Sequence, residues 1–253
     1  MNPSTGEILA MASYPNYDLN SPFTPTSYYA NDWDNLSDSD KTKRIYEMWK
    51  VRSVSETYEP GSVFKLITAS IALEEGITGT DISGDFFCSG TETVSGTPIK
   101  CWRYYNPHQG ESLRDAIMNS CNPAFIQLSK RIGATTIYKY LEAYGLFDKT
   151  NIGLSGESAG IFYPLNKVGS VELATMSFGQ RFTITPLQMI TSIASIANGG
   201  NLMQPRIIKS MTNTDTGEIT YTTPTTVRQV LSSETAETVS YTHLRAHETG
   251  RNL

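Results

Sequence analysis

Apolar and polar positions along this chain form blocks that predict helices in its middle and strands towards both ends. Residues 6–12 are an apolar run after a Pro-Ser-Thr-Gly turn and predict a strand. Residues 14–50 are rich in Tyr, Asn, Asp, Ser and Pro, which predicts a long surface excursion with one short helix near 38–49. The most apolar block, residues 62–73, predicts a helix with almost no polar face, which should lie in the middle of the domain.

Four later segments carry signals for helix starts and stops, mostly Ser, Thr or Pro before the first turn and Gly after the last. They are residues 112–120, 123–132, 135–144 and 185–198. Residues 79–111 are rich in turns, and residues 205–211 and 217–223 predict a hairpin around a turn at 215–217. Helices gathered between terminal strands predict an α/β or α+β domain with antiparallel strand pairing.

Composition narrows the classes of protein without naming a function. The 253 residues are 39% apolar and 18% charged, which suits a globular chain with a sizeable core. The net charge is −5 and the Lys and Arg residues are scattered, so nucleic acid is not an expected partner. No apolar run is long enough to predict a membrane span, and the first residues do not have the pattern of a signal peptide.

Ser62 and Lys65 form the first candidate site. Pro60 and Gly61 break the chain just before Ser62, which places this serine at the start of the apolar helix. Free backbone N–H groups and the helix dipole favour a developing negative charge there. Residues three apart share a helix face, so we expect the Lys65 amine within hydrogen-bond reach of the Ser62 hydroxyl as its base. In the alternative, Ser62 only caps the helix and Lys65 reaches out to the surface.

Ser120 and Asn122 form the second candidate site. In an extended loop, residues two apart point the same way, and Cys121 between them points the other way. A hydroxyl and a carboxamide that face one cleft can relay a proton and hold a peptide amide. In the alternative, Ser120 closes one helix and Asn122 starts the next, just before Pro123.

These two motifs, 58 residues apart and in this order, resemble those of penicillin-binding proteins and serine β-lactamases. The neighbouring residues are more specific, because several segments resemble class B, transpeptidase-only penicillin-binding proteins. These segments are residues 5–15, 58–65 (Tyr-Glu-Pro-Gly-Ser-Val-Phe-Lys), 119–125 and 185–200. The resemblance extends from about residue 3 to about residue 239.

The resemblance implies a fold and a reaction. The fold would be the penicillin-binding transpeptidase or serine β-lactamase-like fold, an α/β (α+β) arrangement in which helices flank an antiparallel sheet around a buried central helix carrying Ser62. Ser62 would be the catalytic nucleophile, acylated by the penultimate D-alanine carbonyl of a stem peptide. Lys65 would be the general base, Ser120 the proton relay and Asn122 the group that binds the substrate amide.

The implied function is a peptidoglycan D,D-transpeptidase that cross-links stem peptides and also binds β-lactam antibiotics covalently. The family implies no cofactor and assigns no metal. It places the protein on the extracytoplasmic side of the bacterial plasma membrane, with cell-wall synthesis proteins such as a glycosyltransferase as partners. Two alternatives remain, a β-lactam-sensing receptor domain and a D,D-carboxypeptidase or β-lactamase.

The chain also departs from the family. The third motif, Lys-Thr-Gly, is absent, so we expect residues 1–239 to be an incomplete transpeptidase domain, truncated at both ends and without its membrane anchor. That motif would carry an oxyanion donor, so the chain alone should be a poor enzyme. Residues 240–253 do not look like the family and resemble translated adapter sequence. Gln180 and Arg181 stand where the family usually has Gln-Gly.

Three cysteines leave their own question open. Cys88 and Cys101 bracket a turn-rich stretch, and His108 follows seven residues after the second of them. The thiols are free and buried, or Cys101 forms a disulfide with Cys88 or Cys121, or Cys88, Cys101 and His108 bind zinc with a carboxylate such as Asp85. The spacing matches no standard zinc pattern.

Overall fold

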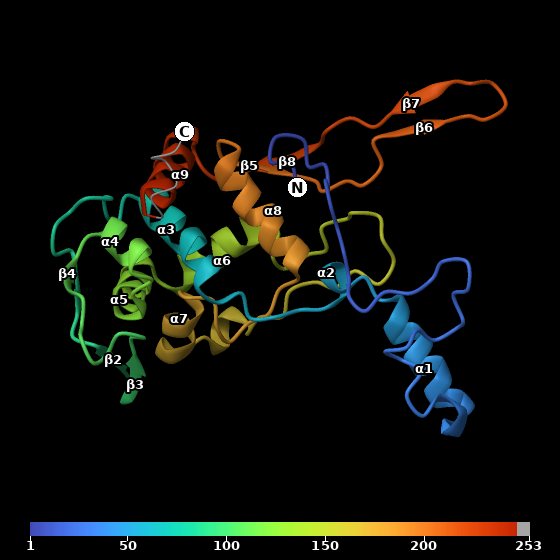
Figure 1. The fold of residues 1–253 in the computed structure, drawn as a ribbon. Coiled ribbons are helices and arrows are strands. Elements are labelled where there is room, and N and C mark those ends of the chain that lie inside the picture. Colours follow the sequence, from blue (N-terminus) through green and yellow to red (C-terminus); the bar gives the residue numbers. More distant parts are fainter. Residues whose placement is uncertain (247–253) are drawn as a thin grey trace.

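The computed structural model describes residues 1–246, with side chains for residues 1–242. Figure 1 shows a mainly helical body from which two segments project. One is the N-terminal excursion with helix α1 (Asp38–Trp49), which confirms the predicted excursion and its helix. The other is a hairpin of β6 (Ser210–Thr212) and β7 (Ile219–Tyr221), which lies at the predicted place with shorter strands.

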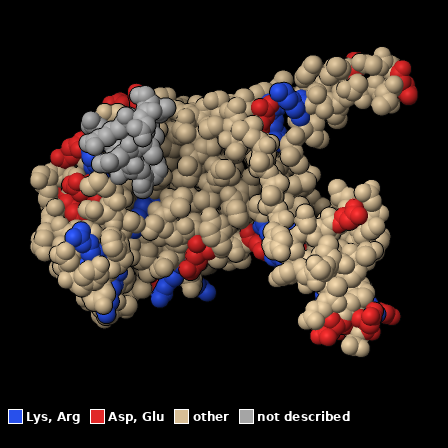
Figure 2. All heavy atoms as spheres, viewed as in Figure 1, with Lys and Arg blue, Asp and Glu red and all other residues tan. Residues whose placement is uncertain are grey.

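Charged groups are mixed over the face of the body that Figure 2 shows. Lys and Arg side chains lie among Asp and Glu side chains there. Acidic groups gather at the far end of the excursion, where α1 begins with Asp38 and Asp40 in its first turn.

A buried helix occupies the centre of the body, as predicted. It starts with the short helix η2 (Gly61–Phe64) and continues as α3 (Lys65–Glu74), in which seven of the ten residues are buried. Helices α5, α8 and α9 pack against α3, and the rings of Phe64 and Phe182 meet edge to face with centroids 4.8 Å apart. Ser62 therefore sits where the core meets the surface.

The helices around α3 were largely predictable. They are α4 (Leu113–Met118), α5 (Asn122–Ile132), α6 (Ala134–Ala143) and α8 (Pro186–Ala197). Ser112 and Asp115 form a capping box at the start of α4, and Thr185 and Gln188 form another at α8. Five helices of the described residues were not predicted: η1 (Trp33–Asn35), α2 (Arg52–Ser55), η3 (Leu165–Lys167), α7 (Ser170–Met176) and α9 (Ser233–Ala246).

Strand pairing is antiparallel, as predicted, but the strands do not form one sheet. Within residues 1–246 they make four separate two-stranded sheets. Besides the β6–β7 hairpin, the pairs are β1 (Phe86–Cys88) with β4 (Gln109–Glu111), β2 (Thr91–Val94) with β3 (Thr97–Lys100), and β5 (Asn201–Met203) with β8 (Thr226–Gln229). In the described part of the chain no strand exceeds four residues, so helices provide most of the body's core.

The predicted strand at residues 6–12 is wrong. Only Glu7 makes a bridge, to Arg206, and that bridge is parallel. The chain then leaves the body, and the Leu9 side chain is 72% exposed. An apolar run becomes a strand only where a partner strand runs beside it for several residues, and none does so here among residues 1–246.

The predicted tail, residues 240–253, begins within helix α9. Helix α9 continues without a break through residues 240–246, and residues 247–253 lie outside the described part. A domain boundary near residue 239 therefore stays a prediction. Among the described residues, no helix combines the length and apolar character needed to cross a bilayer.

Candidate active site

Two glycines shape the chain where it enters η2. Gly61 has a φ of 60°, and its N–H donates a hydrogen bond to the Gly179 carbonyl at 2.9 Å. A Cβ on Gly179 would lie 2.2 Å from the Gly61 oxygen, so only a glycine lets the two segments approach this closely. The contact places Ser62 at an exposed helix start. Gly179 was not predicted, because only its neighbour Arg181 drew attention in the sequence.

Lys65, one turn after Ser62, is only 3% exposed. Its Nζ donates to the carbonyl oxygen of Ser120 at 2.7 Å, to the hydroxyl of Ser120 at 3.0 Å and to Oδ1 of Asn122 at 2.8 Å. Burial lowers the pKa of the Lys65 amine to about 8, although nearby thiols and Glu111 act in the opposite direction. The alternative in which Lys65 reaches the surface is therefore wrong.

Ser120 joins the two residues of the first motif. Its hydroxyl donates to Ser62 Oγ at 3.0 Å and accepts from Lys65 Nζ. The direct bond that the sequence spacing predicted between Ser62 and Lys65 is not among the hydrogen bonds of residues 1–242. Three acceptors of the 120–122 turn already use the three donors of the ammonium.

The turn at residues 120–122 fits both interpretations of the second motif, which links two helices and also directs two polar side chains to one place. Asn122 begins α5 and Pro123 follows it, so the motif does link two helices. Ser120 has a φ of 48°, a left-handed conformation that is uncommon outside glycine. In this conformation Ser120 and Asn122 both face Lys65, while the buried Cys121 lies on the other side of the turn.

Comparison with known proteins agrees with this geometry. A family model described as "Penicillin binding protein transpeptidase domain" matches residues 1–251. The chain belongs to this family. Its α+β fold, its antiparallel pairing and the class B resemblance of its motifs are thereby confirmed.

Several relatives from this family are similar over nearly the whole chain. Stage V sporulation protein D of Bacillus subtilis is 36% identical over 100% of this chain, and peptidoglycan D,D-transpeptidase PbpA of Mycobacterium tuberculosis is 33% identical over 93%. The chain spans 36% and 47% of the length of these relatives. The structure of penicillin-binding protein A from M. tuberculosis as a penicillin G acyl-enzyme complex matches with a TM-score of 0.82 and 31% identity. That match covers 100% of this chain and 57% of the other.

The cysteines of this transpeptidase domain are free and buried, so neither predicted disulfide forms. Their sulfur atoms and a ring nitrogen of His108 nevertheless gather in one cluster. Asp85, the expected carboxylate of a zinc site, is not part of it, because its side chain pairs with Arg131 at 2.7 Å. Burial raises the pKa of the Cys101 and Cys121 thiols.

Arg181 received no role from the sequence. It adopts a φ of 63°, the left-handed conformation that the family's usual glycine takes without strain. Its backbone N–H donates to Glu59 Oε1 at 2.8 Å and its guanidinium pairs with Glu172 at 2.7 Å. Arg181 therefore has a strained backbone conformation, and its side chain forms an ion pair with Glu172 near the entrance to η2.

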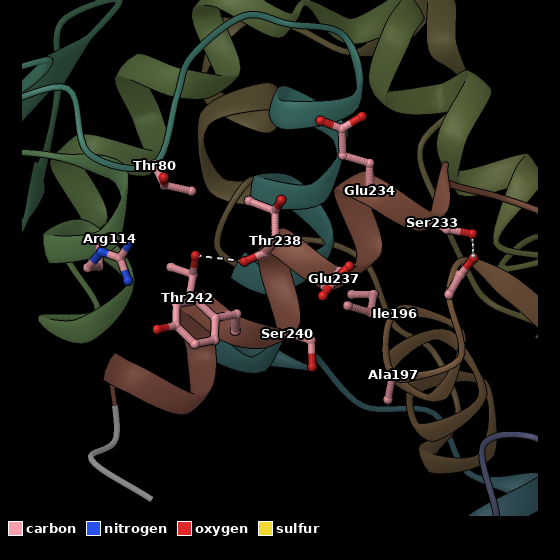
Figure 3. A pocket seen from close by; sticks show the side chains of 12 residues that line it. Thr80, Arg114, Ile196, Ala197, Ser233, Glu234, Glu237, Thr238, Ser240 and Thr242 are labelled. Carbon is pink, nitrogen blue, oxygen red and sulfur yellow. Dashed lines mark hydrogen bonds between the residues drawn. The ribbon is translucent and has the colours of Figure 1, made fainter. Parts of the chain in front are cut away.

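The hollow drawn in Figure 3 is not this site. It has a volume of about 790 Å³ and lies between α4, α8 and α9, with Arg114, Glu234 and Glu237 among its lining residues. None of the four motif residues lines it. The four motif residues therefore lie away from this hollow, at the entrance to η2.

Proposed function

We propose that this domain catalyses the D,D-transpeptidation that cross-links peptidoglycan stem peptides, and that β-lactams acylate the same serine. The observation that carries the proposal is the hydrogen-bond path from Ser62 Oγ through the Ser120 hydroxyl to Lys65 Nζ. The printed name of one relative, peptidoglycan D,D-transpeptidase, supports the reaction. The β-lactam acyl-enzyme complexes among similar solved structures support the covalent step.

Acylation is the first step of this reaction. Ser62 Oγ attacks the carbonyl carbon of the penultimate D-alanine, and its proton passes through the Ser120 hydroxyl to the neutral Lys65 amine. The peptide C–N bond breaks as Ser120 donates its proton to the leaving nitrogen and takes the proton from Lys65 in exchange, so D-alanine departs and Lys65 is neutral again. Ser62 then holds the peptide as an ester.

Deacylation by an amine is the second step. The amino group of a neighbouring stem peptide attacks the ester carbonyl and forms a new amide bond. The proton that the amine loses returns to Ser62, so the enzyme ends as it began. A water molecule in place of the amine would give hydrolysis, the carboxypeptidase or β-lactamase outcome.

The surroundings of Lys65 suit a general base. With a pKa of about 8, about a tenth of the Lys65 amines are neutral at pH 7, against well under a hundredth for an ordinary lysine. Asn122 holds the amine through Oδ1, which leaves its Nδ2 hydrogens to donate to a substrate carbonyl. The backbone N–H of Ser62, at the helix start, would be one donor to the oxyanion.

Mass spectrometry of the full-length protein after penicillin treatment tests the proposal. We expect one covalent adduct, on Ser62. Ser62→Ala should abolish it with little change in stability, because that hydroxyl lies at the surface. Ser89→Ala, which also removes an exposed serine hydroxyl, should keep full labelling. An adduct on another serine would refute the assignment.

The fate of a fluorescent penicillin separates the alternatives. Rapid hydrolysis would identify a β-lactamase, whereas a long-lived adduct leaves a transpeptidase or a β-lactam-sensing receptor domain. Cross-linking of stem peptides in vitro separates these two, because a sensor acylates without turnover. The class B character of the residues around both motifs favours the transpeptidase.

The reaction also implies a place and a partner for the whole protein. We infer that it acts on the extracytoplasmic side of the plasma membrane, beside a glycosyltransferase that supplies the glycan strands. Accessibility of the full-length protein to an added protease in intact spheroplasts tests the location. Co-purification with a glycosyltransferase tests the partner.

A further inference from the structure

Four side chains with metal-binding atoms converge behind the second motif. Cys88 ends β1, Cys101 follows β3, His108 precedes β4 and Cys121 precedes α5. Their ligand atoms all lie within 4.8 Å of one another, and Cys101 Sγ is 3.7 Å from His108 Nδ1. The three cysteines are at most 1% exposed, and so is the His108 side chain. Segments far apart in sequence thus bury four ligand atoms at one point.

Polar atoms in and beside this cluster lack partners. His108 Nε2 and Glu111 Oε2 are buried without a hydrogen bond among residues 1–242. The other ring nitrogen of His108 contacts only the weakly bonding sulfur of Cys101 and, at 3.8 Å, Glu111 Oε1. A buried polar atom left unpaired costs about 1–3 kcal/mol, so this arrangement calls for a bound partner.

The donor atoms identify the chemical class of that partner. Three thiolates and one imidazole form the Cys₃His set of closed structural zinc sites, whereas magnesium and calcium prefer oxygen. A Zn–S bond of about 2.3 Å places tetrahedral neighbours about 3.8 Å apart. The separations here, up to 4.8 Å, need only small side-chain rotations to reach that geometry.

We propose that Cys88, Cys101, His108 and Cys121 bind one zinc-type cation. Three S–metal bonds and one N–metal bond form, and the three thiol protons leave to the solvent. Glu111 borders the cluster without being one of the four ligands, and its Oε1 lies 3.8 Å from His108 Nδ1. A disulfide would use two of the four side chains and leave the other two without partners.

Cys121 gives this cation a link to the active site. The residue lies between Ser120 and Asn122, and Ser120 has the left-handed φ of 48°. Such a conformation costs about 1–3 kcal/mol and persists only where its surroundings hold it. A metal bond at Cys121 would anchor the turn to the segment that carries β1 to β4. Cys121 is therefore a positioning residue, and this part of the inference rests on the proposed function.

Metal content of the 253-residue chain tests the site itself. We expect about one zinc per chain, by elemental analysis, after purification in reducing buffer without chelator. Replacement by Co²⁺ should give the intense thiolate-to-cobalt absorption of a tetrahedral site. Chelation should lower Tm, because a cation that binds the folded state stabilises it. A folded chain without zinc or cobalt binding, or with a disulfide between these cysteines after anaerobic purification, would overturn the proposal.

Variants locate the ligands. Cys101→Ser and His108→Gln should each weaken metal binding at least 100-fold. Asp85→Asn is the matched control, because Asp85 lies near the cluster in sequence but pairs with Arg131 and Thr78, so its metal content should be unchanged. Equal metal loss in all three variants would refute this ligand set. If the ligand variants do not fold, the wild-type measurements above still decide.

Acylation of the full-length protein tests the positioning role separately. Removal of the cation should lower the second-order rate of β-lactam acylation at least tenfold, and zinc should restore it, with Ser62 still the labelled residue. An unchanged rate in a metal-binding protein would overturn the positioning role and leave the metal site standing. If neither the metal-free nor the zinc-loaded protein acylates, the proposed function fails, whereas the zinc content still tests the metal site.

Discussion

The two faces of the turn at residues 120–122 are built in opposite ways. On one face, Ser120 and Asn122 receive all three donors of the buried Lys65 ammonium, and the Ser120 hydroxyl continues to Ser62. On the other face, Cys121 joins two thiols and an imidazole that make few and weak hydrogen bonds. Among residues 1–242, the donors of the Lys65 ammonium all have acceptors, whereas polar atoms beside the cysteines lack partners.

The difference teaches where a ligand is needed. A buried ammonium is tolerated because three acceptors compensate for part of its lost hydration, and the remaining cost appears as a lowered pKa. On the cysteine face, backbone N–H groups of Arg103, Asn122 and Ala124 reach the sulfurs of Cys101 and Cys121. His108 Nε2 and Glu111 Oε2, however, have no hydrogen bond among residues 1–242. We therefore expect the Lys65 face of the turn to fail when one of its own residues changes, and the cysteine face to fail when the proposed cation is removed.

The largest effect should follow from changing Lys65, the proposed general base. Lys65→Arg should lower the acylation rate as severely as Lys65→Ala, by about 10²–10⁴, because arginine keeps the charge but does not release its proton. Stopped-flow acylation of the full-length protein measures this. Lys130→Arg, a change at an exposed lysine paired with Glu92, is the control and should have no effect. A rate within tenfold of wild type in Lys65→Arg would point to a purely electrostatic role.

The sequence predicted the elements that carry their own local signals. Helices α4 and α8 begin with capping boxes whose residues are visible in the sequence, and the Pro60-Gly61 break marks the start of η2. Helix α9 and the β1–β4 and β5–β8 pairs depend on contacts between distant segments, which no local pattern reports. The predicted strand at 6–12 failed for the same reason, since it lacked a partner.

The candidate sites divide in the same way. Ser62 and Lys65 are three residues apart on one helix, and the relation of Ser120 to Asn122 is also local, so spacing predicted both pairs. The cysteine cluster needs four segments to meet. Sequence proximity therefore suggested Asp85 as a ligand, and only the fold shows that Cys121 takes that place.

The next largest effect should come from moving Ser62 away from Ser120 while leaving the cysteine face intact. Gly179→Ala introduces a Cβ 2.2 Å from the Gly61 oxygen and requires a positive φ of 79°, so the backbone before Ser62 must shift. We expect acylation to fall about 10–100-fold, as small misplacements do, and stability to fall by about 2–3 kcal/mol.

A second glycine provides the control for that prediction. Gly76, after α3, also has a positive φ of 63°, but a Cβ there would meet nothing within 4 Å. Gly76→Ala should cost only the backbone strain, about 1 kcal/mol, and leave acylation unchanged. Equal acylation losses in the two variants would show that the Gly61–Gly179 contact does not position Ser62. Urea unfolding and acylation rates measure the two effects.

The pH dependence of acylation should show a smaller effect of the same face. Only the neutral Lys65 amine can accept the Ser62 proton, and the pKa of that amine is about 8. The rate should therefore rise about tenfold per pH unit up to pH 7, continue to rise to about pH 8 and level off above it. A rate that does not change between pH 6 and 9 would argue against Lys65 as the base.

The smallest effect should appear just outside both faces, at Arg181. Arg181→Gly removes the strain of a left-handed φ, worth about 1 kcal/mol, and loses a partly exposed ion pair with Glu172, worth about 0–1 kcal/mol. The backbone hydrogen bond to Glu59 does not depend on the side chain and should persist. We therefore expect a stability between unchanged and about 1 kcal/mol higher by urea unfolding, with acylation within twofold of wild type. Arg181→Ala keeps the strain and loses the ion pair, so it should be the less stable of the two variants. A large loss of acylation in Arg181→Gly, with stability preserved, would show that residue 181 also contributes to acylation. The contributing residues would then not be limited to Ser62, Ser120 and Lys65.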